Sequence, residues 1–222
     1  ELAALGDVYV NEAFSNSHRT HASMVALPKL LPSFIGLQCE EELKQLSKAL
    51  APEHPSVAII GGVKFETKIP LITSILSSYD KVLLGGALGN DMLKARGLPV
   101  GASLVSAEPV PGVLAGDERI MLPTDAAFED ENGIGRTSFV SDTRANEKIM
   151  DIGPQTYTAW AKVVSTARFV LWNGPLGVYE QGYIESTDAI AAALSASNAR
   201  AIVGGGDTAI SLQKFTFDPQ RV

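Results

Sequence analysis

The sequence predicts an α/β protein whose core is a doubly wound parallel β-sheet. Short segments at residues 57–60, 81–84 and 169–172, which are apolar throughout apart from Lys81, alternate with longer segments of helical periodicity. Strands that are apolar on both faces indicate a sheet that helices cover on both sides. Several of these strands end in a glycine-rich turn, and ligands bind at the carboxyl edge of such sheets. The pattern therefore predicts one nucleotide-sized site at that edge.

The order of the elements follows from apolar periodicity and turn residues. The first part of the chain gives a strand at 7–11, a polar loop at 15–21, breaks at Pro28 and Pro32, and an amphipathic helix at 40–50. The alternating part gives strands at 57–60, 81–84, 120–122, 169–172 and 201–203, and helices at 64–78, 92–95, 154–167, 184–197 and after 207. Residues 125–142 are polar and stay unassigned, and the strand at 7–11 is expected to lack its sheet partners.

Composition excludes several classes of protein. The chain has 222 residues, of which 45% are hydrophobic, so it can bury a substantial core. A net charge of −7 argues against a nucleic-acid partner, which normally requires a basic face. The single cysteine, Cys39, forms no internal disulfide, and no apolar run is long enough to span a bilayer. Because the pattern is already under way at Glu1, we interpret the chain as a piece of a longer protein, and its single cysteine fits a cytoplasmic location.

The turn after residues 57–60 carries the first candidate anion site. Gly61 and Gly62 let the backbone approach a ligand at the start of a helix, where unpaired N–H groups attract anions. Lys64 and Lys68 are four residues apart and share one face of that helix. Together they form a candidate phosphate clamp, although a simple turn with two solvated lysines fits the same residues.

Two further glycine turns have comparable roles. Gly85 and Gly86 offer a flat surface free of side chains that suits a purine ring, although close packing of a helix on the sheet explains them equally well. The three glycines at 204–206 precede Asp207 and indicate a close approach of the backbone to a ligand. Asp207 is either the N-cap of the last helix or a ligand of Mg²⁺.

Three polar side chains complete the candidate site. Asn173 and Glu180 follow the strand at 169–172, and Glu180 is placed to accept hydrogen bonds from ribose hydroxyls. Arg19 lies in the early polar loop, where its guanidinium is suited to bidentate contact with a phosphate. A surface glutamate and an incidental arginine remain the simpler interpretations of these residues.

Taken in order, the motifs resemble those of the phosphoglycerate kinase family. The matching strings run from one end of the chain to the other: Asp7-Val8-Tyr9-Val10-Asn11-Glu12-Ala13-Phe14, His18-Arg19-Thr20-His21-Ala22-Ser23, Gly61-Gly62-Val63-Lys64, Asp151-Ile152-Gly153-Pro154, Trp172-Asn173-Gly174-Pro175-Leu176-Gly177-Val178-Tyr179-Glu180 and Gly204-Gly205-Gly206-Asp207-Thr208. The resemblance implies that residues 1–39 end a domain that binds 3-phosphoglycerate, that 40–50 form the interdomain helix, and that 51–222 form most of a Rossmann-like nucleotide domain.

The family's functional residues carry over by position. The resemblance implies that Arg19 holds the 3-phosphate of the substrate, that Lys64 stabilises the phosphoryl group in transfer, and that Asp207 holds Mg²⁺. The implied nucleotide-binding positions are Gly62, Lys64, Lys68, Gly85, Gly86, Asn173, Pro175, Gly177, Val178, Glu180, Gly205, Gly206, Asp207 and Thr208. The implied ligands are ADP or ATP with 3-phosphoglycerate or 1,3-bisphosphoglycerate, bound by a glycolytic kinase that is expected to be a monomer.

The chain also departs from the family's pattern. Val63 stands where alanine is usual, and Ala87 stands where a third glycine is usual, which affects the detail of the adenine pocket. The basic substrate patch is missing apart from Arg19, so the segment alone is expected to be inactive. The alternatives are a nucleotide-binding module without transfer activity, a dehydrogenase, which the lack of G-x-G-x-x-G disfavours, and a purely structural domain.

Overall fold

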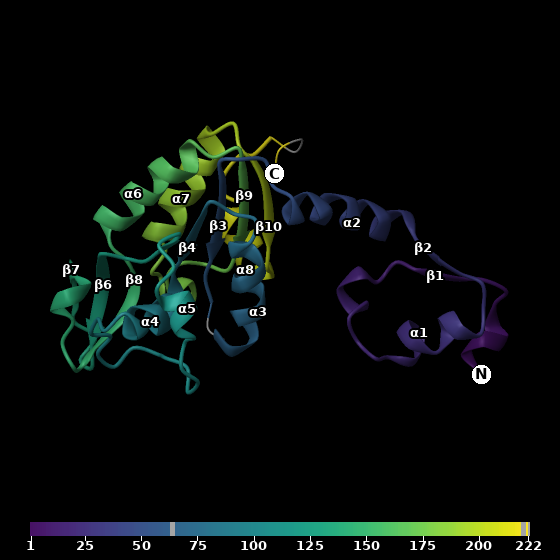
Figure 1. The fold of residues 1–222 in the computed structure, drawn as a ribbon, viewed down its shortest axis with the longest axis horizontal. Coiled ribbons are helices and arrows are strands. Elements are labelled where there is room, and N and C mark those ends of the chain that lie inside the picture. Colours follow the sequence, from purple (N-terminus) through teal and green to yellow (C-terminus); the bar gives the residue numbers. More distant parts are fainter. Residues whose placement is uncertain (63–64, 219–220, 222) are drawn as a thin grey trace. The chain divides into compact units, whose positions relative to one another are not determined.

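The computed structural model describes residues 1–62, 65–218 and 221, and divides them into two compact units, Glu1–Ala51 and Pro52–Val222. Unit 1 contains strands β1 (Tyr9–Asn11) and β2 (Ser33–Ile35) and helices α1 (Ala22–Val25) and α2 (Leu37–Leu50), together with 3-10 helices at Leu2–Leu5, Phe14–Asn16 and Leu27–Lys29. The expectation that the first strand lacks partners is wrong, because β1 pairs in parallel with β2 (Figure 1).

Helix α2 begins three residues earlier than the sequence predicts. Its first backbone N–H groups bond to a carboxylate from far along the chain: Gln38 and Cys39 donate to Glu12, at 3.4 and 3.2 Å. A helix start leaves such donors without intrahelical partners, and an anion there stabilises it. The apolar periodicity located the helix at 40–50, but Glu12 sets its first residue.

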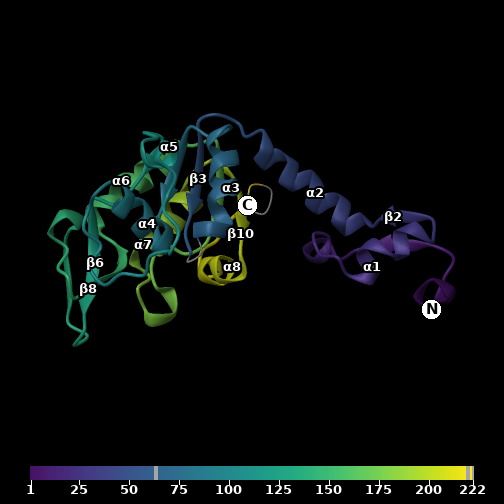
Figure 2. The same ribbon diagram turned by 60° about the horizontal axis from the view of Figure 1, so that its bottom comes forward.

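Unit 2 is built on a five-stranded, wholly parallel sheet of order β10-β9-β3-β4-β5. Its strands are β3 (Ser56–Ile60), β4 (Lys81–Leu84), β5 (Ile120–Met121), β9 (Phe169–Asn173) and β10 (Arg200–Gly204). Its helices are α3 (Phe65–Leu76), α4 (Gly86–Ala95), α5 (Gly112–Ala115), α6 (Pro154–Ser165), α7 (Glu185–Ala196) and α8 (Gly206–Leu212). The predicted α/β class is confirmed, and Figures 1 and 2 show helices packed around the sheet.

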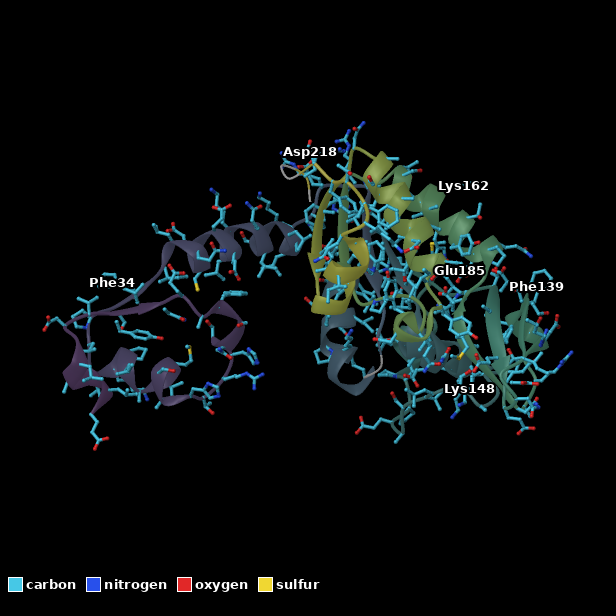
Figure 3. The ribbon with its side chains drawn as sticks, turned by 180° about the vertical axis from the view of Figure 1, so that it is seen from behind. Phe34, Phe139, Lys148, Lys162, Glu185 and Asp218 are labelled. Carbon is cyan, nitrogen blue, oxygen red and sulfur yellow. The ribbon has the colours of Figure 1, made fainter. Side chains whose placement is uncertain are left out.

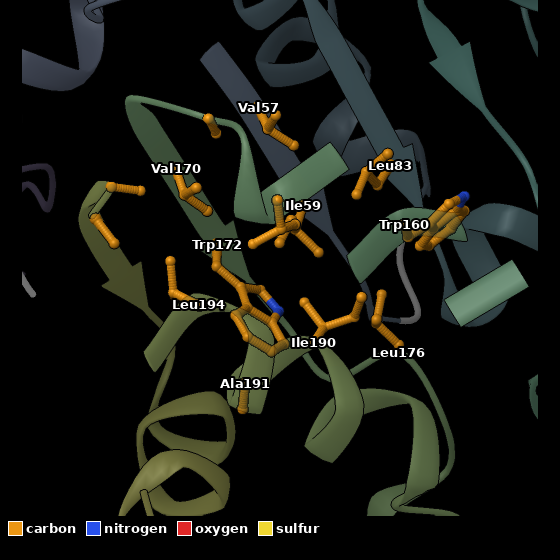
Figure 4. Close-up of a cluster of buried hydrophobic side chains, with 14 of the residues drawn as sticks. Val57, Ile59, Leu83, Trp160, Val170, Trp172, Leu176, Ile190, Ala191 and Leu194 are labelled. Carbon is orange, nitrogen blue, oxygen red and sulfur yellow. The ribbon is translucent and has the colours of Figure 1, made fainter. Parts of the chain in front are cut away.

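Alternate residues of β3 are buried on opposite faces of this sheet. Val57 and Ile59 pack with Trp160 of α6 and Ile190 of α7 in one hydrophobic cluster (Figure 4). The intervening residues of the strand point to the other face and are also fully buried. Burial of both faces explains why the strand is a continuous apolar run.

Residues 125–142, which the sequence left unassigned, form most of a second, antiparallel sheet of order β7-β6-β8. Its strands are β6 (Asp125–Asp130), β7 (Gly135–Phe139) and β8 (Glu147–Ile152), with a short 3-10 helix at Val140–Asp142. A small core around Phe128 and Val140 supports it. The sheet holds an ion pair in which Arg136 donates twice to Glu147, at 2.6 and 2.7 Å.

Candidate nucleotide site

The turns that follow β3 and β9 are in direct backbone contact. The N–H of Gly61 donates to the carbonyl of Asn173 at 2.8 Å, which extends the strand pairing into the turns. A Cβ on Gly61 would lie 1.9 Å from the carbonyl oxygen of Pro175. Gly174 has φ +92°, and a Cβ there would lie 2.7 Å from the Gly61 backbone. Glycine is therefore required on both sides of this contact.

The turn after β4 joins the same surface. Gly86 donates its N–H to the carbonyl of Leu176 at 3.0 Å. Gly86 has φ +60°, and a Cβ there would lie 3.0 Å from the backbone nitrogen of Gly62. Three glycine turns from three strands thus meet at the carboxyl edge of the sheet, as the sequence predicted, and they expose main chain in place of side chains.

Lys68 bridges the turns that follow β3 and β9. Its ammonium group donates to the carbonyl of Gly61 at 2.8 Å and to the side-chain oxygen of Asn173 at 3.2 Å. Burial lowers the pKa of Lys68 below its usual value. Lys68 therefore links the turns after β3 and β9. Lys64, the other lysine of the predicted pair, lies outside the residues that the structure describes.

The fourth glycine turn reaches the site through Thr208. Its hydroxyl accepts a hydrogen bond from the N–H of Gly174 at 2.8 Å. Gly205 has φ +93°, and α8 begins at the next residue, Gly206. The interpretation of Asp207 as the N-cap is therefore wrong, because Gly205 holds that position and Asp207 lies within the first turn. The side chain of Asp207 lies outside the described part of the chain.

A cavity of about 350 Å³ opens beside these turns. Six predicted nucleotide-binding residues line it: Gly62, Gly86, Pro175, Gly177, Val178 and Glu180. Of the other predicted positions that the structure describes, Gly85 packs against Leu176, while Lys68, Asn173 and Thr208 bond to the turns themselves. The exposed Glu180 belongs to a 3-10 helix at Tyr179–Gln181.

The opposite wall of the cavity comes from the antiparallel sheet, and the sequence did not predict it. Glu129 of β6 and Lys148 of β8 lie opposite each other in register, and both line the cavity. Glu129 accepts a hydrogen bond from the hydroxyl of Tyr183 at 2.5 Å. That bond is the main cause that raises the pKa of Tyr183 to about 12. Residues 125–142 carried no signal for Glu129, because a charged residue in a polar stretch is ordinary.

Asp151 of β8 is the most deeply buried charged residue in the cavity wall, with 2% of its surface exposed. It accepts hydrogen bonds from the N–H of Ile152 at 2.9 Å and from the N–H of Ser186 at 3.2 Å, and the Ser186 hydroxyl also donates to it. Burial raises the pKa of Asp151 to about 6. The sequence contained Asp151 only as part of a matching string and assigned it no role.

Two predicted features, the phosphate contact of Arg19 and the Mg²⁺ site, are not part of the cavity lining described above. Arg19 belongs to unit 1, where its side chain is exposed and its backbone N–H donates to Asn16 at 2.9 Å. Among the described residues, no three histidine, cysteine or carboxylate side chains cluster as a metal site. The expected Mg²⁺ site stays a prediction that depends on Asp207, and a single carboxylate is enough for such a site when phosphates supply further ligands.

The fold and site define a class: an α/β protein with a nucleotide-sized cavity at the carboxyl edge of a parallel sheet. A family model described as phosphoglycerate kinase matches residues 1–221. The chain belongs to the phosphoglycerate kinase family. Within the residues that the structure describes, none of the helices has the length and apolar character needed to cross a membrane.

Curated relatives and solved structures agree with this assignment. The phosphoglycerate kinase of Herpetosiphon aurantiacus is 42% identical over 227 residues, which cover 97% of this chain and 58% of that protein. That of Solibacter usitatus is 44% identical over 216 residues, which cover 94% of this chain and 55% of that protein. The structure of phosphoglycerate kinase from Coxiella burnetii matches with a TM-score of 0.85 at 34% identity, over 96% of this chain and 58% of that one. The chain therefore spans rather more than half of the relatives it matches.

Proposed function

We propose that this chain is the nucleotide-binding part of a phosphoglycerate kinase, which transfers a phosphoryl group between 1,3-bisphosphoglycerate and Mg-ADP to give 3-phosphoglycerate and ATP. The observation that carries the proposal is the cavity of about 350 Å³ lined by glycine turns and by Glu180. Main-chain surface accepts a flat base and close phosphates, and a carboxylate at the edge suits ribose hydroxyls.

The predicted residues have distinct roles in this reaction. Lys64 stabilises the transferring phosphoryl group, Arg19 holds the 3-phosphate of the substrate, and Asp207 with the nucleotide phosphates holds Mg²⁺. The ion supplies positive charge that neutralises the phosphate oxygens. Lys68, bonded to Gly61 and Asn173, keeps the turns in register for the phosphates.

The chemistry demands positioning and positive charge more than covalent participation by the protein. The acyl phosphate passes its phosphoryl group to the terminal oxygen of ADP in one in-line step. Closure between the two domains of the family's enzymes brings the substrates together and excludes water. Because the chain spans only 58% of a relative such as the Herpetosiphon aurantiacus protein, we expect it to be inactive by itself.

A coupled assay with 3-phosphoglycerate and Mg-ATP on the full-length protein, with the 222-residue chain run beside it, tests the proposal. We expect turnover by the full-length protein and none by the chain. Lys64→Ala in the full-length protein should lower turnover more than nucleotide affinity, because its charge matters most in the transition state. A folded full-length protein without turnover would contradict the kinase assignment. Saturable ADP binding in that case would favour the nucleotide-binding module.

Two further properties belong to the same proposal. A glycolytic phosphoglycerate kinase acts in the cytoplasm on small molecules, and we propose that this one does so as a monomer. Asp207→Ala is expected to weaken binding of Mg-ADP and to leave the fold intact. Unchanged Mg-ADP affinity in that variant would overturn the metal assignment.

A further inference from the structure

We infer that Asp151 is a positioning residue for the nucleotide cavity, which holds the loop from Gly177 to Glu180 against β8 and the start of α7. The inference rests on the proposed nucleotide function and adds a residue that the sequence motifs gave no role. The carboxylate of Asp151 contacts its own strand β8, the start of α7 and this loop at once, and it lines the cavity.

The contact with the loop is close and depends on a missing side chain. A Cβ on Gly177 would lie 2.5 Å from the Oδ1 atom of Asp151 and 2.5 Å from the carbonyl oxygen of Tyr183. The next residue, Val178, donates its N–H to the carbonyl of Met150 at 2.8 Å. The loop therefore contacts β8 at two successive residues, Gly177 and Val178, and the second of these is two positions before Glu180, which lines the cavity.

The contact with α7 depends on negative charge. Ser186 lies in the first turn of α7, and both its N–H and its hydroxyl donate to Asp151. With the N–H of Ile152, three donors converge on this carboxylate. An ionised carboxylate accepts all three and favours the positive end of the helix, whereas a protonated one gives up an acceptor position. Ionisation of Asp151 thus tightens these local contacts, even though burial makes the charge costly for the fold as a whole.

Protonation of Asp151 therefore links the cavity to pH. Burial is the largest cause that raises the pKa of Asp151 to about 6, and the charge of Glu185 raises it further. The elements packed around it carry these ionisable side chains: Glu185 and Asp188 of α7, Asp125, Glu129 and Asp130 of β6, Glu147 and Lys148 of β8, Asp91 and Lys94 of α4, Glu180 of the loop, and Tyr183 after it; Glu185 and Lys148 are labelled in Figure 3. As pH falls through 6, the carboxylate is neutralised, and the hydrogen bonds from Ile152 and Ser186 that hold it beside Gly177 become weaker.

The chain offers a matched control in Asp125. This residue is also buried, at 1% exposure, and lies in the same small sheet. It also caps a helix: Gln155 and Thr156 at the start of α6 donate their N–H groups to it at 2.9 and 2.8 Å. Asp125 does not belong to the described lining of the cavity. The two aspartates therefore differ in their contact with the site and share their structural role.

The test is titration of the full-length protein with Mg-ADP between pH 5 and pH 8, comparing the parent with Asp151→Asn and Asp125→Asn. Ionisation of ADP affects the parent and both variants equally, so the readout is the ratio of each variant's affinity for Mg-ADP to that of the parent at the same pH. We expect Asp151→Asn to bind about tenfold more weakly than the parent at pH 7.5, the scale of one charged hydrogen bond. The ratio should approach one at pH 5, where the parent's Asp151 is neutral, and Asp125→Asn should match the parent at every pH.

A second variant keeps the inference testable if Asp151→Asn fails to fold. Ser186→Ala removes a donor to the ionised carboxylate, so it raises the pKa of Asp151 and should move the midpoint of the pH dependence upward. If the parent binds Mg-ADP but the affinity ratio is constant with pH, or the Ser186→Ala midpoint is unmoved, Asp151 has a structural role alone. If the folded parent does not bind Mg-ADP, the proposed function itself fails.

Discussion

The two sheets of unit 2 build opposite walls of one cavity by different means. The parallel sheet contributes main chain: its strands end in glycine turns that touch one another through backbone atoms. The antiparallel sheet contributes charged side chains: Glu129, Lys148 and the buried Asp151 line the cavity, and Asp125 and Glu147 are buried in the same sheet behind it. The comparison teaches that a site can take its shape from one sheet and its electrostatics from another. Changes to shape should be the more damaging, because backbone cannot move aside.

The largest expected effect is therefore Gly61→Ala. The added Cβ would lie 1.9 Å from the carbonyl oxygen of Pro175 and 2.9 Å from that of Gly174, both of them backbone atoms. We expect the free energy of unfolding to fall by about 3 kcal/mol, the upper range for overpacking a rigid site. Urea denaturation followed by circular dichroism measures it.

Gly112→Ala is the control for this prediction. Gly112 begins α5, and a Cβ added there would meet no described atom within 4 Å. Alanine at this position should leave stability unchanged or raise it by about 0.5 kcal/mol, because it restricts the unfolded chain. Equal losses of unfolding free energy in Gly61→Ala and Gly112→Ala would contradict a special requirement for glycine in the turns at the cavity edge.

The next effect is expected inside the antiparallel sheet, at Glu147→Gln. Glu147 has 2% of its surface exposed and accepts both hydrogen bonds of the Arg136 fork, and the N–H of Arg144 donates to it at 2.9 Å. The Arg136 bond is the first cause that lowers the pKa of Glu147 to about 2. Removing the charge should lower the melting temperature at pH 7 by about 5 °C or more.

The sign of the pH dependence sharpens this prediction. The folded pKa of Glu147 lies below its usual value, so its contribution is present above about pH 4.5 and is lost as pH falls toward 2. The difference in melting temperature between parent and Glu147→Gln should therefore shrink between pH 4.5 and pH 2. A difference that stays constant over this range would contradict a role for the charge.

The same contrast explains what the sequence could predict. Glycine turns after apolar strands are local patterns, so the parallel sheet and its edge followed from residues such as Gly61 and Gly86 alone. The β6 strand begins with Asp125, which is buried only because α6 offers it two N–H groups and the Thr156 hydroxyl. No local pattern distinguishes such an aspartate from one in a loop.

Helix ends show the same limit on a smaller scale. Glu12 and Asp151 accept hydrogen bonds from the first turns of α2 and α7, and both come from distant parts of the chain. Sequence patterns find a cap only when it is next to the helix it stabilises. The N-cap role, one of the two roles open for Asp207 from the sequence, had that basis, and Gly205 holds the position instead.

Asp151 and Glu147 belong to one strand, β8, and should respond to pH in opposite ways. Burial raises the pKa of Asp151 from 3.8 in an unfolded chain to about 6, so its contribution to stability is present below pH 3.8 and is lost as pH rises through 6. A shift of that size corresponds to about 3 kcal/mol between the two limits. Asp151→Asn should abolish this part of the pH dependence.

Measurement of unfolding free energies at pH 4 and pH 7 in parent and variant tests this prediction. The parent should lose more stability than Asp151→Asn on going from pH 4 to pH 7, because only the parent must ionise a buried acid. The reverse order would mean that the three donors to Asp151 outweigh its burial. That result would place its folded pKa below 3.8 and remove the pH link to the cavity.

The smallest effect is expected where the parallel sheet itself carries an ion pair. Arg200 at the start of edge strand β10 lies 3.4 Å from Glu53, and both side chains are more than half exposed. Arg200→Gln should change the free energy of unfolding by no more than about 0.5 kcal/mol, because water and salt screen such pairs. A loss of stability comparable with that of Glu147→Gln, measured by the same urea denaturation, would contradict the contrast between the two sheets. Charge would then stabilise both sheets, and reliance on the shape of its turns would no longer distinguish the parallel sheet.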